Sequence, residues 1–147
     1  MTRMPRRIRR LALGLAVLAI AVVVAPAATA QDAGTLRVTV RYTGPGTVDA
    51  THELFVWVFE TPNIDVDSVP IAADVLTRNG GTLTFRGLPK QVYLVAAFDE
   101  RGDYDGSSVP PSGMPITIHG SGGVAEPVPT GDNAAVTVTF DDSTRMP

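Results

Sequence analysis

Apolar and polar residues alternate strictly over residues 35–42. One face of this segment carries apolar side chains, namely Leu36, Val38, Val40 and Tyr42. The other face carries polar side chains, namely Thr35, Arg37, Thr39 and Arg41. Because successive side chains of a strand point to opposite faces, this period of two predicts a strand with one face in the core and the other in water.

Two further segments are apolar on both faces. Residues 54–59 read Leu-Phe-Val-Trp-Val-Phe, and residues 92–98 are apolar throughout. Their aromatic and β-branched residues favour strands, and apolar side chains on both faces are typical of central strands. The second segment follows a short strand ending near Phe85 and a tight turn, and we expect the rest of the fold to be arranged around it.

The remaining strands are shorter. Residues 71–76 fit an edge strand or one helical turn, and the strand is favoured because its neighbours are strands. The glycines after Asn79 suggest a hairpin into residues 82–85, and residues 116–118 and 135–140 are also expected to be strands. With about seven strands and a turn every ten or so residues, the chain is predicted to be all-β, a single antiparallel Greek-key β-sandwich.

Residues 1–30 have the pattern of an export signal. A basic head containing five arginines precedes an uninterrupted run of apolar or small residues at 11–24, and Ala28-Thr29-Ala30 forms a small-x-small cleavage site before Gln31. The apolar run ends short of the roughly 20 residues that cross a bilayer, which favours cleavage over a retained anchor. The arginine pairs leave both the general and the twin-arginine export routes open.

Removal of the signal changes the charge of the protein. Residues 1–30 hold five of the twelve basic residues and none of the fifteen acidic ones, so residues 31–147 carry a net charge of −8. This balance argues against nucleic-acid partners and against anionic membranes as partners. We expect no stable membrane insertion after the signal is cleaved. Residues 31–147 suffice for one domain, and the chain has no cysteine for a disulfide or a lipid anchor. We therefore expect a secreted or periplasmic protein.

The acidic loop over residues 99–106 is the candidate functional segment. Asp99, Asp103 and Asp105 are oxygen ligands of the kind that Ca²⁺ prefers, and Gly106 closes the loop. Arg101 stands at the first ligand position of an EF-hand pattern and Ser112 at its distal glutamate position, so the loop is not an EF-hand. A solvated acidic turn is the favoured interpretation, with a Ca²⁺ site as the alternative.

No catalytic set is predicted. The two histidines, His52 and His119, lie near strand ends and outside any known nucleophile motif. The aromatic row of Phe55, Trp57 and Phe59 is expected to belong to the core, although an uncovered row would form a carbohydrate-binding platform. Tyr104 is the better candidate for an exposed aromatic contact.

The phrase Phe85-Arg86-Gly87-Leu88-Pro89, followed by Tyr93, resembles the carboxypeptidase regulatory-like, or transthyretin-like, β-sandwich modules of exported bacterial proteins. In that family a phrase of the type Phe-x-Gly-Leu-Pro-x-Gly-x-Tyr links two strands, and here Gln91 replaces the second glycine. Two enzyme families share the fold. The chain lacks the terminal Tyr-Arg-Gly-Ser of hydroxyisourate hydrolases and the closely spaced histidines of intradiol dioxygenases.

These observations predict an exported, non-catalytic module. It would bind, or serve as a structural accessory, at the cell envelope, with an unidentified protein or glycan as its partner. The alternatives are a Ca²⁺-binding module acting through residues 99–106 and a carbohydrate-binding module, and an enzyme is the least favoured.

Overall fold

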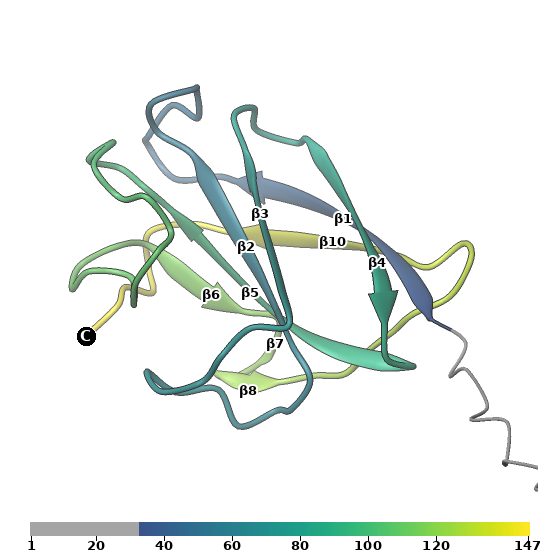
Figure 1. Ribbon diagram of the computed structural model, residues 1–147. Helices are drawn as coiled ribbons and strands as arrows, with labels where there is room; N and C mark the ends of the chain where they lie inside the picture. Colours follow the sequence, from purple (N-terminus) through teal and green to yellow (C-terminus); the bar gives the residue numbers. More distant parts are fainter. Residues whose placement is uncertain (1–32) are drawn as a thin grey trace, which may run out of the picture.

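The computed structural model describes residues 33–147, so the predicted export signal lies outside the described residues (Figure 1). The described part of the chain contains strands and no helix, and therefore no helix that could cross a membrane. The strands are β1 (Gly34–Tyr42), β2 (Leu54–Phe59), β3 (Ala72–Leu76), β4 (Thr82–Leu88), β5 (Gln91–Phe98), β6 (Ile116–Ile118), β7 (Gly120–Ser121), β8 (Val124–Ala125), β9 (Val128–Pro129) and β10 (Ala135–Phe140). The predicted all-β class is confirmed.

The strand count differs from the expected seven or so. Ten strands are present in residues 33–147, and the three additional ones, β7, β8 and β9, are two residues long each. Two residues are too few to show a hydrophobic period, which is why the sequence pattern does not reveal these strands.

The longer strands form two sheets. One has the order β10-β1-β4, and the other has the order β3-β2-β5-β6, with β9 pairing to the start of β5. The prediction that residues 92–98 form a central strand is confirmed, since β5 lies between β2 and β6. The favoured interpretation of residues 71–76 is also confirmed, because β3 pairs with β2 as an edge strand.

Two expectations about strand pairing are wrong. First, β1 and β10 run parallel, with Arg37 opposite Ala135, so the fold is not wholly antiparallel. A period of two identifies the faces of a strand but not its direction. Second, β3 and β4 do not form a hairpin, because they belong to different sheets.

The turn between β3 and β4 is anchored to β1. The side-chain amide of Asn79 accepts a hydrogen bond from the Tyr42 N–H (2.9 Å) and donates one to the Tyr42 carbonyl (2.7 Å). The Gly80 N–H donates to the Val40 carbonyl at 2.9 Å. These contacts hold the turn beside β1, where the chain passes from the sheet of β3 to the sheet of β4. Asn79-Gly80-Gly81 therefore forms a crossover between sheets.

The larger apolar cluster lies between the two sheets, which Figure 1 shows as two layers. It contains the predicted inward side chains of β1 together with alternate residues of β2 and β5. Phe98 is 1% exposed, and its ring centroid lies 4.4 Å from that of Tyr42. The inward faces predicted for residues 35–42 and 135–140 are confirmed, although Val136 is only partly buried.

A second apolar cluster covers the opposite face of the β3-β2-β5-β6 sheet. Its buried members are Phe55, Trp57, Phe59, Tyr93, Val95, Ala97 and Met114. Side chains from the surrounding loops and the C-terminal tail pack against them, namely Ile64, Tyr104 and Met146, as do Ala125 of β8 and Ile116 and Ile118 of β6. This sheet is therefore covered on both faces, which explains why β2 and β5 are apolar throughout.

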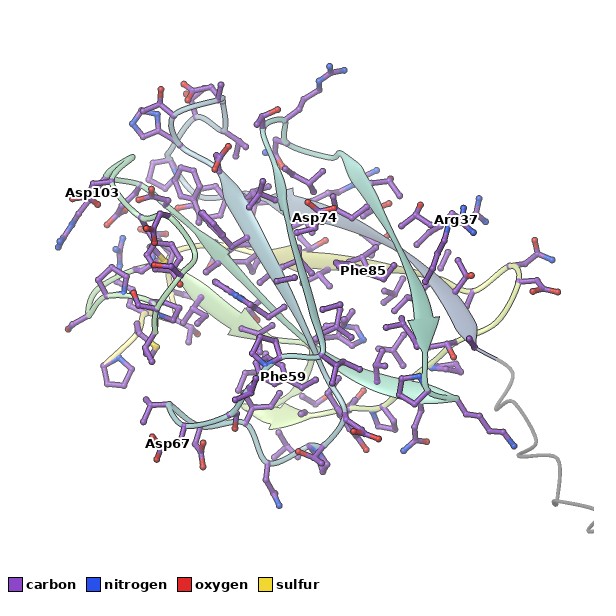
Figure 2. The ribbon with its side chains drawn as sticks, viewed as in Figure 1. Arg37, Phe59, Asp67, Asp74, Phe85 and Asp103 are labelled. Carbon is purple, nitrogen blue, oxygen red and sulfur yellow. The ribbon has the colours of Figure 1, made fainter. Side chains whose placement is uncertain are left out.

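The outer face of the β10-β1-β4 sheet is open. Its outward residues alternate with core residues along each strand and are exposed or half-buried (Figure 2). The two sheets thus differ: one is covered on both faces, and the other presents a polar face to solvent.

Candidate functional site

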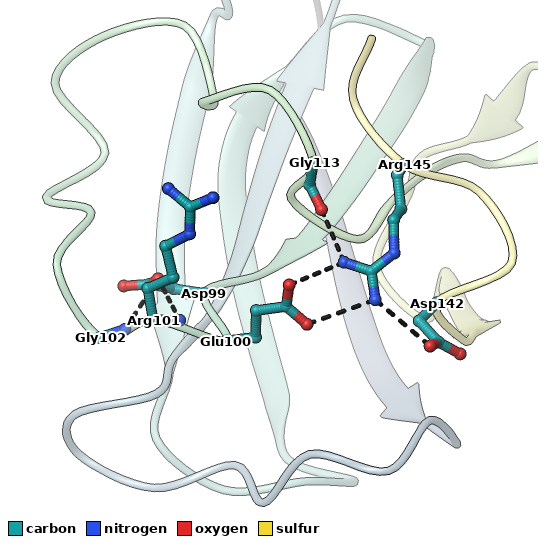
Figure 3. Close-up of polar contacts among 7 residues, drawn as sticks. All are labelled: Asp99, Glu100, Arg101, Gly102, Gly113, Asp142 and Arg145. Atoms are coloured by element: carbon teal, nitrogen blue, oxygen red, sulfur yellow. Dashed lines mark hydrogen bonds and ion pairs between the residues drawn. The ribbon is translucent and has the colours of Figure 1, made fainter.

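Asp99, the first residue after β5, is the one buried charged side chain in the described part of the chain, with 2% of its surface exposed. Its Oδ1 accepts hydrogen bonds from the N–H groups of Arg101 (3.2 Å) and Gly102 (2.9 Å), as Figure 3 shows. Its Oδ2 accepts a third from the Tyr104 N–H at 2.9 Å. Both carboxylate oxygens therefore bind backbone donors of the loop that follows.

Asp103 and Asp105 have different surroundings. Both are exposed, and Asp103 lies at the periphery of the domain (Figure 2). Asp105 accepts hydrogen bonds from the Ser107 hydroxyl (2.6 Å) and the Ser107 N–H (2.9 Å), which lower the pKa of its carboxyl. The structure does not bring Asp99, Asp103 and Asp105 into one ligand set, and residues 33–147 contain no group of three or more His, Asp or Glu side chains placed to hold a metal.

The loop after β5 is joined to the C-terminal tail by Arg145 (Figure 3). The guanidinium of Arg145 donates from Nη1 to Glu100 Oε1 (2.7 Å) and from Nη2 to Glu100 Oε2 (3.4 Å). It also donates to the Gly113 carbonyl (2.7 Å) and to Asp142 Oδ2 (3.3 Å). Such a two-point contact between planar groups fixes orientation as well as distance.

Backbone hydrogen bonds extend this contact. The Gly113 N–H donates to the Met146 carbonyl at 2.8 Å, and the Met146 N–H donates to the Met114 carbonyl at 2.9 Å. The Ile116 N–H donates to the Thr144 carbonyl at 3.0 Å. The tail thus runs beside residues 113–116, and Met146 reaches the second apolar cluster.

Replacement of Arg145 by alanine is expected to loosen the tail while leaving the sheets intact. The reason is that Arg145 joins Glu100, Gly113 and Asp142, whereas the sheets have their own ladders. Amide hydrogen exchange should be faster at Gly113, Ile116 and Met146 and unchanged at Val95. Arg78→Ala, in an exposed turn, is the control, and unchanged exchange at all three tail-linked amides would contradict this assignment.

Two hollows adjoin this region. A cavity of about 10 Å³ lies between Asp99, Arg101, Pro111 and Met114, which is room for about one water molecule. A wider groove of about 270 Å³ separates β10 from β6 and the tail. Its lining is rich in hydroxyl groups and contains one carboxylate, from the residues Thr43, Thr117, Thr139, Asp141, Ser143 and Thr144, with Ile116 and Phe140 beside them.

The histidines do not assemble a catalytic set in the described residues. His52 Nδ1 lies 3.0 Å from Asp49 Oδ1 on an exposed turn, and the same oxygen accepts hydrogen bonds from the N–H groups of His52 and Thr51. His119 follows β6, and its N–H donates to the Leu94 carbonyl at 2.9 Å. The Asp49 contacts fix the turn that precedes β2.

Three exposed aspartates have carboxyl groups whose pKa is lowered by hydrogen bonds. Hydrogen bonds from His52 and Thr51 lower the pKa of Asp49, and those from Ser107 and Ser143 lower the pKa of Asp105 and Asp141. A carboxyl whose folded pKa lies below its unfolded value stabilises the fold above the unfolded pKa, and this contribution is lost as the pH falls through the folded pKa. The ordinary value for these groups is 3.8.

We therefore expect the contribution of these aspartates to the melting temperature to be constant from neutral pH to about pH 5 and to disappear at lower pH. Thermal melts across this range test the expectation. The variant Asp105→Asn should show a shallower acid decline than the wild type, and an equally steep decline in both proteins would contradict the role of Ser107.

The aromatic row on β2 is buried. Phe55, Trp57 and Phe59 are 4%, 7% and 8% exposed, so the prediction that they belong to a core is confirmed, although their cluster lies outside the inter-sheet core. Tyr104 is not the exposed aromatic that the sequence suggests. Its ring lies edge-on at 4.9 Å from that of Phe55, and its hydroxyl donates to the Ser108 carbonyl.

Sequence reasoning missed two features of this region. The role of Asp99 could have been predicted from the sequence. An aspartate at a strand end, with a glycine three residues later, is typical of turns capped by a side chain. The contact of Arg145 with Glu100 had none, because 45 positions separate the two residues.

No protein-family model matches this chain, and neither the curated proteins nor the solved structures contain a match to it.

Proposed function

We propose that this chain is an exported, non-catalytic module that acts by binding, or as a structural accessory, at the cell envelope. Its domain, residues 31–147, would be a Greek-key sandwich of the transthyretin-like type. The export signal pattern in residues 1–30 supports the location. The phrase Gly87-Leu88-Pro89, which joins β4 to β5 across the two sheets, supports the fold type.

This proposal rests on the hydrogen bonds that the carboxylates of the acidic loop make. Asp99 and Asp105 bind donors of their own loop, and Glu100 binds Arg145 of the tail. Carboxylates employed in this way hold the loop in shape, as a rigid binding scaffold requires, whereas a general acid or base needs a free side chain facing a substrate. The turn contacts of His52 support the same proposal.

Co-sedimentation with isolated cell envelopes tests the proposal. Full-length protein, expressed with residues 1–30 and purified in its processed form, is expected to pellet with envelopes in a saturable manner. Envelopes stripped of protein and envelopes stripped of glycan then identify the class of partner. Recovery of the protein in the supernatant at every envelope concentration would refute a binding role.

The alternative function is Ca²⁺ binding by Asp99, Asp103 and Asp105. The hydrogen bonds of Asp99 disfavour it. Its oxygens would have to release three backbone donors before they could bind a cation. We therefore expect millimolar Ca²⁺ to leave the melting temperature equal to that measured with chelator. A site saturated about 100-fold would instead add roughly 2.7 kcal/mol to the free energy of unfolding. A rise reversed by chelator and absent in Asp99→Asn would establish the site.

A further inference from the structure

The open face of the β10-β1-β4 sheet carries arginine and threonine side chains and no carboxylate. Its residues share one direction along three neighbouring strands and are Thr35, Arg37, Thr39, Arg41, Thr82, Thr84, Arg86, Ala135, Thr137 and Thr139. We call this surface the Thr/Arg face. Three of the seven basic residues that follow residue 30 lie on it.

The strand register arranges these side chains in rows. Thr137, Thr39 and Thr82 lie opposite one another across the three strands, and the hydroxyls of Thr39 and Thr82 are 2.7 Å apart. Arg41, opposite Thr139, lies on one side of this hydroxyl row. Arg37, opposite Ala135 and Thr84, lies on the other side. A row of hydroxyl groups is therefore flanked by guanidinium groups on both sides.

Arg37 and Arg86 are diagonal neighbours. Arg86 lies opposite Thr35, which places its Cα about 7–8 Å from that of Arg37. Arg41 lies four residues beyond Arg37 on β1, at about 13 Å. Like charges at diagonal positions repel each other, and an anion bound between them would remove this repulsion.

The charges of this face have no partners among residues 33–147. The ion pairs of the described chain involve His52 and Arg145, and none reaches Arg37, Arg41 or Arg86. All three side chains are exposed, and Figure 2 shows Arg37 extending outward from the sheet. An acid-free basic face on a chain with a net charge of −8 beyond residue 30 is complementary to an anion from outside.

We propose that the Thr/Arg face binds an acidic polysaccharide, a polymer whose sugars carry carboxylate groups. This inference rests on the proposed binding function and names its ligand class and its surface. Guanidinium groups form two-point hydrogen bonds with carboxylates, and threonine hydroxyls both donate to and accept from sugar hydroxyls. Carbohydrate binding is thereby assigned to this exposed face, and the buried aromatic row is not the binding surface.

The composition of the face favours such a polymer over a nucleic acid. The face has no aromatic side chain on which bases could stack. A row of hydroxyl groups separates Arg41 from the neighbouring Arg37 and Arg86, which suits a polymer with dispersed charge. A densely charged polymer such as DNA would be repelled by the acidic remainder of the protein.

Binding to immobilised polygalacturonate tests the proposal. The full chain, expressed with residues 1–30 and purified in its processed form, is compared with the triple variant Arg37→Gln, Arg41→Gln, Arg86→Gln. The matched control is Arg78→Gln, Lys90→Gln, Arg101→Gln, which removes the same charge from exposed positions elsewhere. We expect the face variant to bind at least about tenfold more weakly and the control to bind nearly as well as the wild type. Binding of the wild type should weaken as salt increases.

Three results would overturn the proposal: the absence of binding to polygalacturonate, equal loss in both triple variants, or equal binding to dextran or duplex DNA. If the face variant melts early, the single variants Arg37→Gln and Arg41→Gln, each expected to weaken binding several-fold, replace it. Envelope co-sedimentation separates the two proposals. If the face variant pellets with envelopes as the wild type does, the proposed function stands and the Thr/Arg face is not the site.

Discussion

Replacement of Asp99 by alanine is expected to lower the free energy of unfolding by about 3 kcal/mol. The carboxylate is buried and accepts hydrogen bonds from the N–H groups of Arg101, Gly102 and Tyr104. Alanine would leave these donors without their partner, and a buried donor without an acceptor costs more than the net worth of one hydrogen bond. For a domain of this size the melting temperature should fall by about 10 °C.

Two control variants make this prediction specific. Asp99→Asn retains one acceptor oxygen and should lose roughly half as much stability as Asp99→Ala. Asp103→Ala removes an exposed carboxylate from the same loop and should change the free energy of unfolding by less than about 0.5 kcal/mol. Equal melting temperatures for Asp99→Ala and Asp103→Ala would show that Asp99 does not organise the loop.

Replacement of Trp57 by alanine is expected to cost about 3–5 kcal/mol, the usual range for a large aromatic side chain in a core. Trp57 is 7% exposed and belongs to the second cluster, where its ring stacks at 5.7 Å on that of Phe55. The loops and the tail that cover this cluster contribute its remaining contacts. The loss should therefore also loosen the loop that contains Tyr104, whose ring lies 6.3 Å from that of Trp57.

Denaturant unfolding measures the stability of this variant, and fluorescence tests the burial of Trp57 directly. The wild-type emission should be blue-shifted and resist quenching by iodide, because the loops exclude the quencher. An exposed binding platform would behave in the opposite way. It would show strong quenching and a stability change of less than about 0.5 kcal/mol in Trp57→Ala.

The sequence pattern predicts the fold as far as side-chain direction determines it. Leu36, Val38 and Val40 face the core because a strand alternates its faces, and β5 is central because residues 92–98 are apolar throughout. Strand direction and partner choice depend on contacts between distant residues, such as those of Asn79 with Tyr42. For this reason the parallel pairing of β1 with β10 and the crossover after β3 were not predictable.

The candidate site was predictable in part. The acidic loop was located from its composition, and a solvated turn was favoured over a Ca²⁺ site. Asp103 and Asp105 are exposed, whereas Asp99 is buried and faces backbone donors. An aspartate in a glycine-containing loop suits either turn capping or cation binding, and the path of the backbone decides which of the two occurs. The tail that carries Arg145 has no periodic pattern, so its place beside the loop came from the structure.

The Thr/Arg face was predictable only in part from the alternating pattern of residues 35–42. The polar half of residues 35–42 indicated a solvated strand face, and the register then placed Arg86 and the threonines of β4 and β10 beside Arg37 and Arg41. Strand pairing thus assembles one basic surface on an acidic protein.

Fractionation of cells that produce the full chain tests both its export and its attachment at the envelope. The protein is expected to lie outside the cytoplasm, to begin at Gln31 and to leave the envelope fraction in high salt without detergent, because the proposed attachment through the Thr/Arg face is electrostatic. A protein that begins at Met1 and stays in the cytoplasm, or one that needs detergent for release, would contradict this expectation.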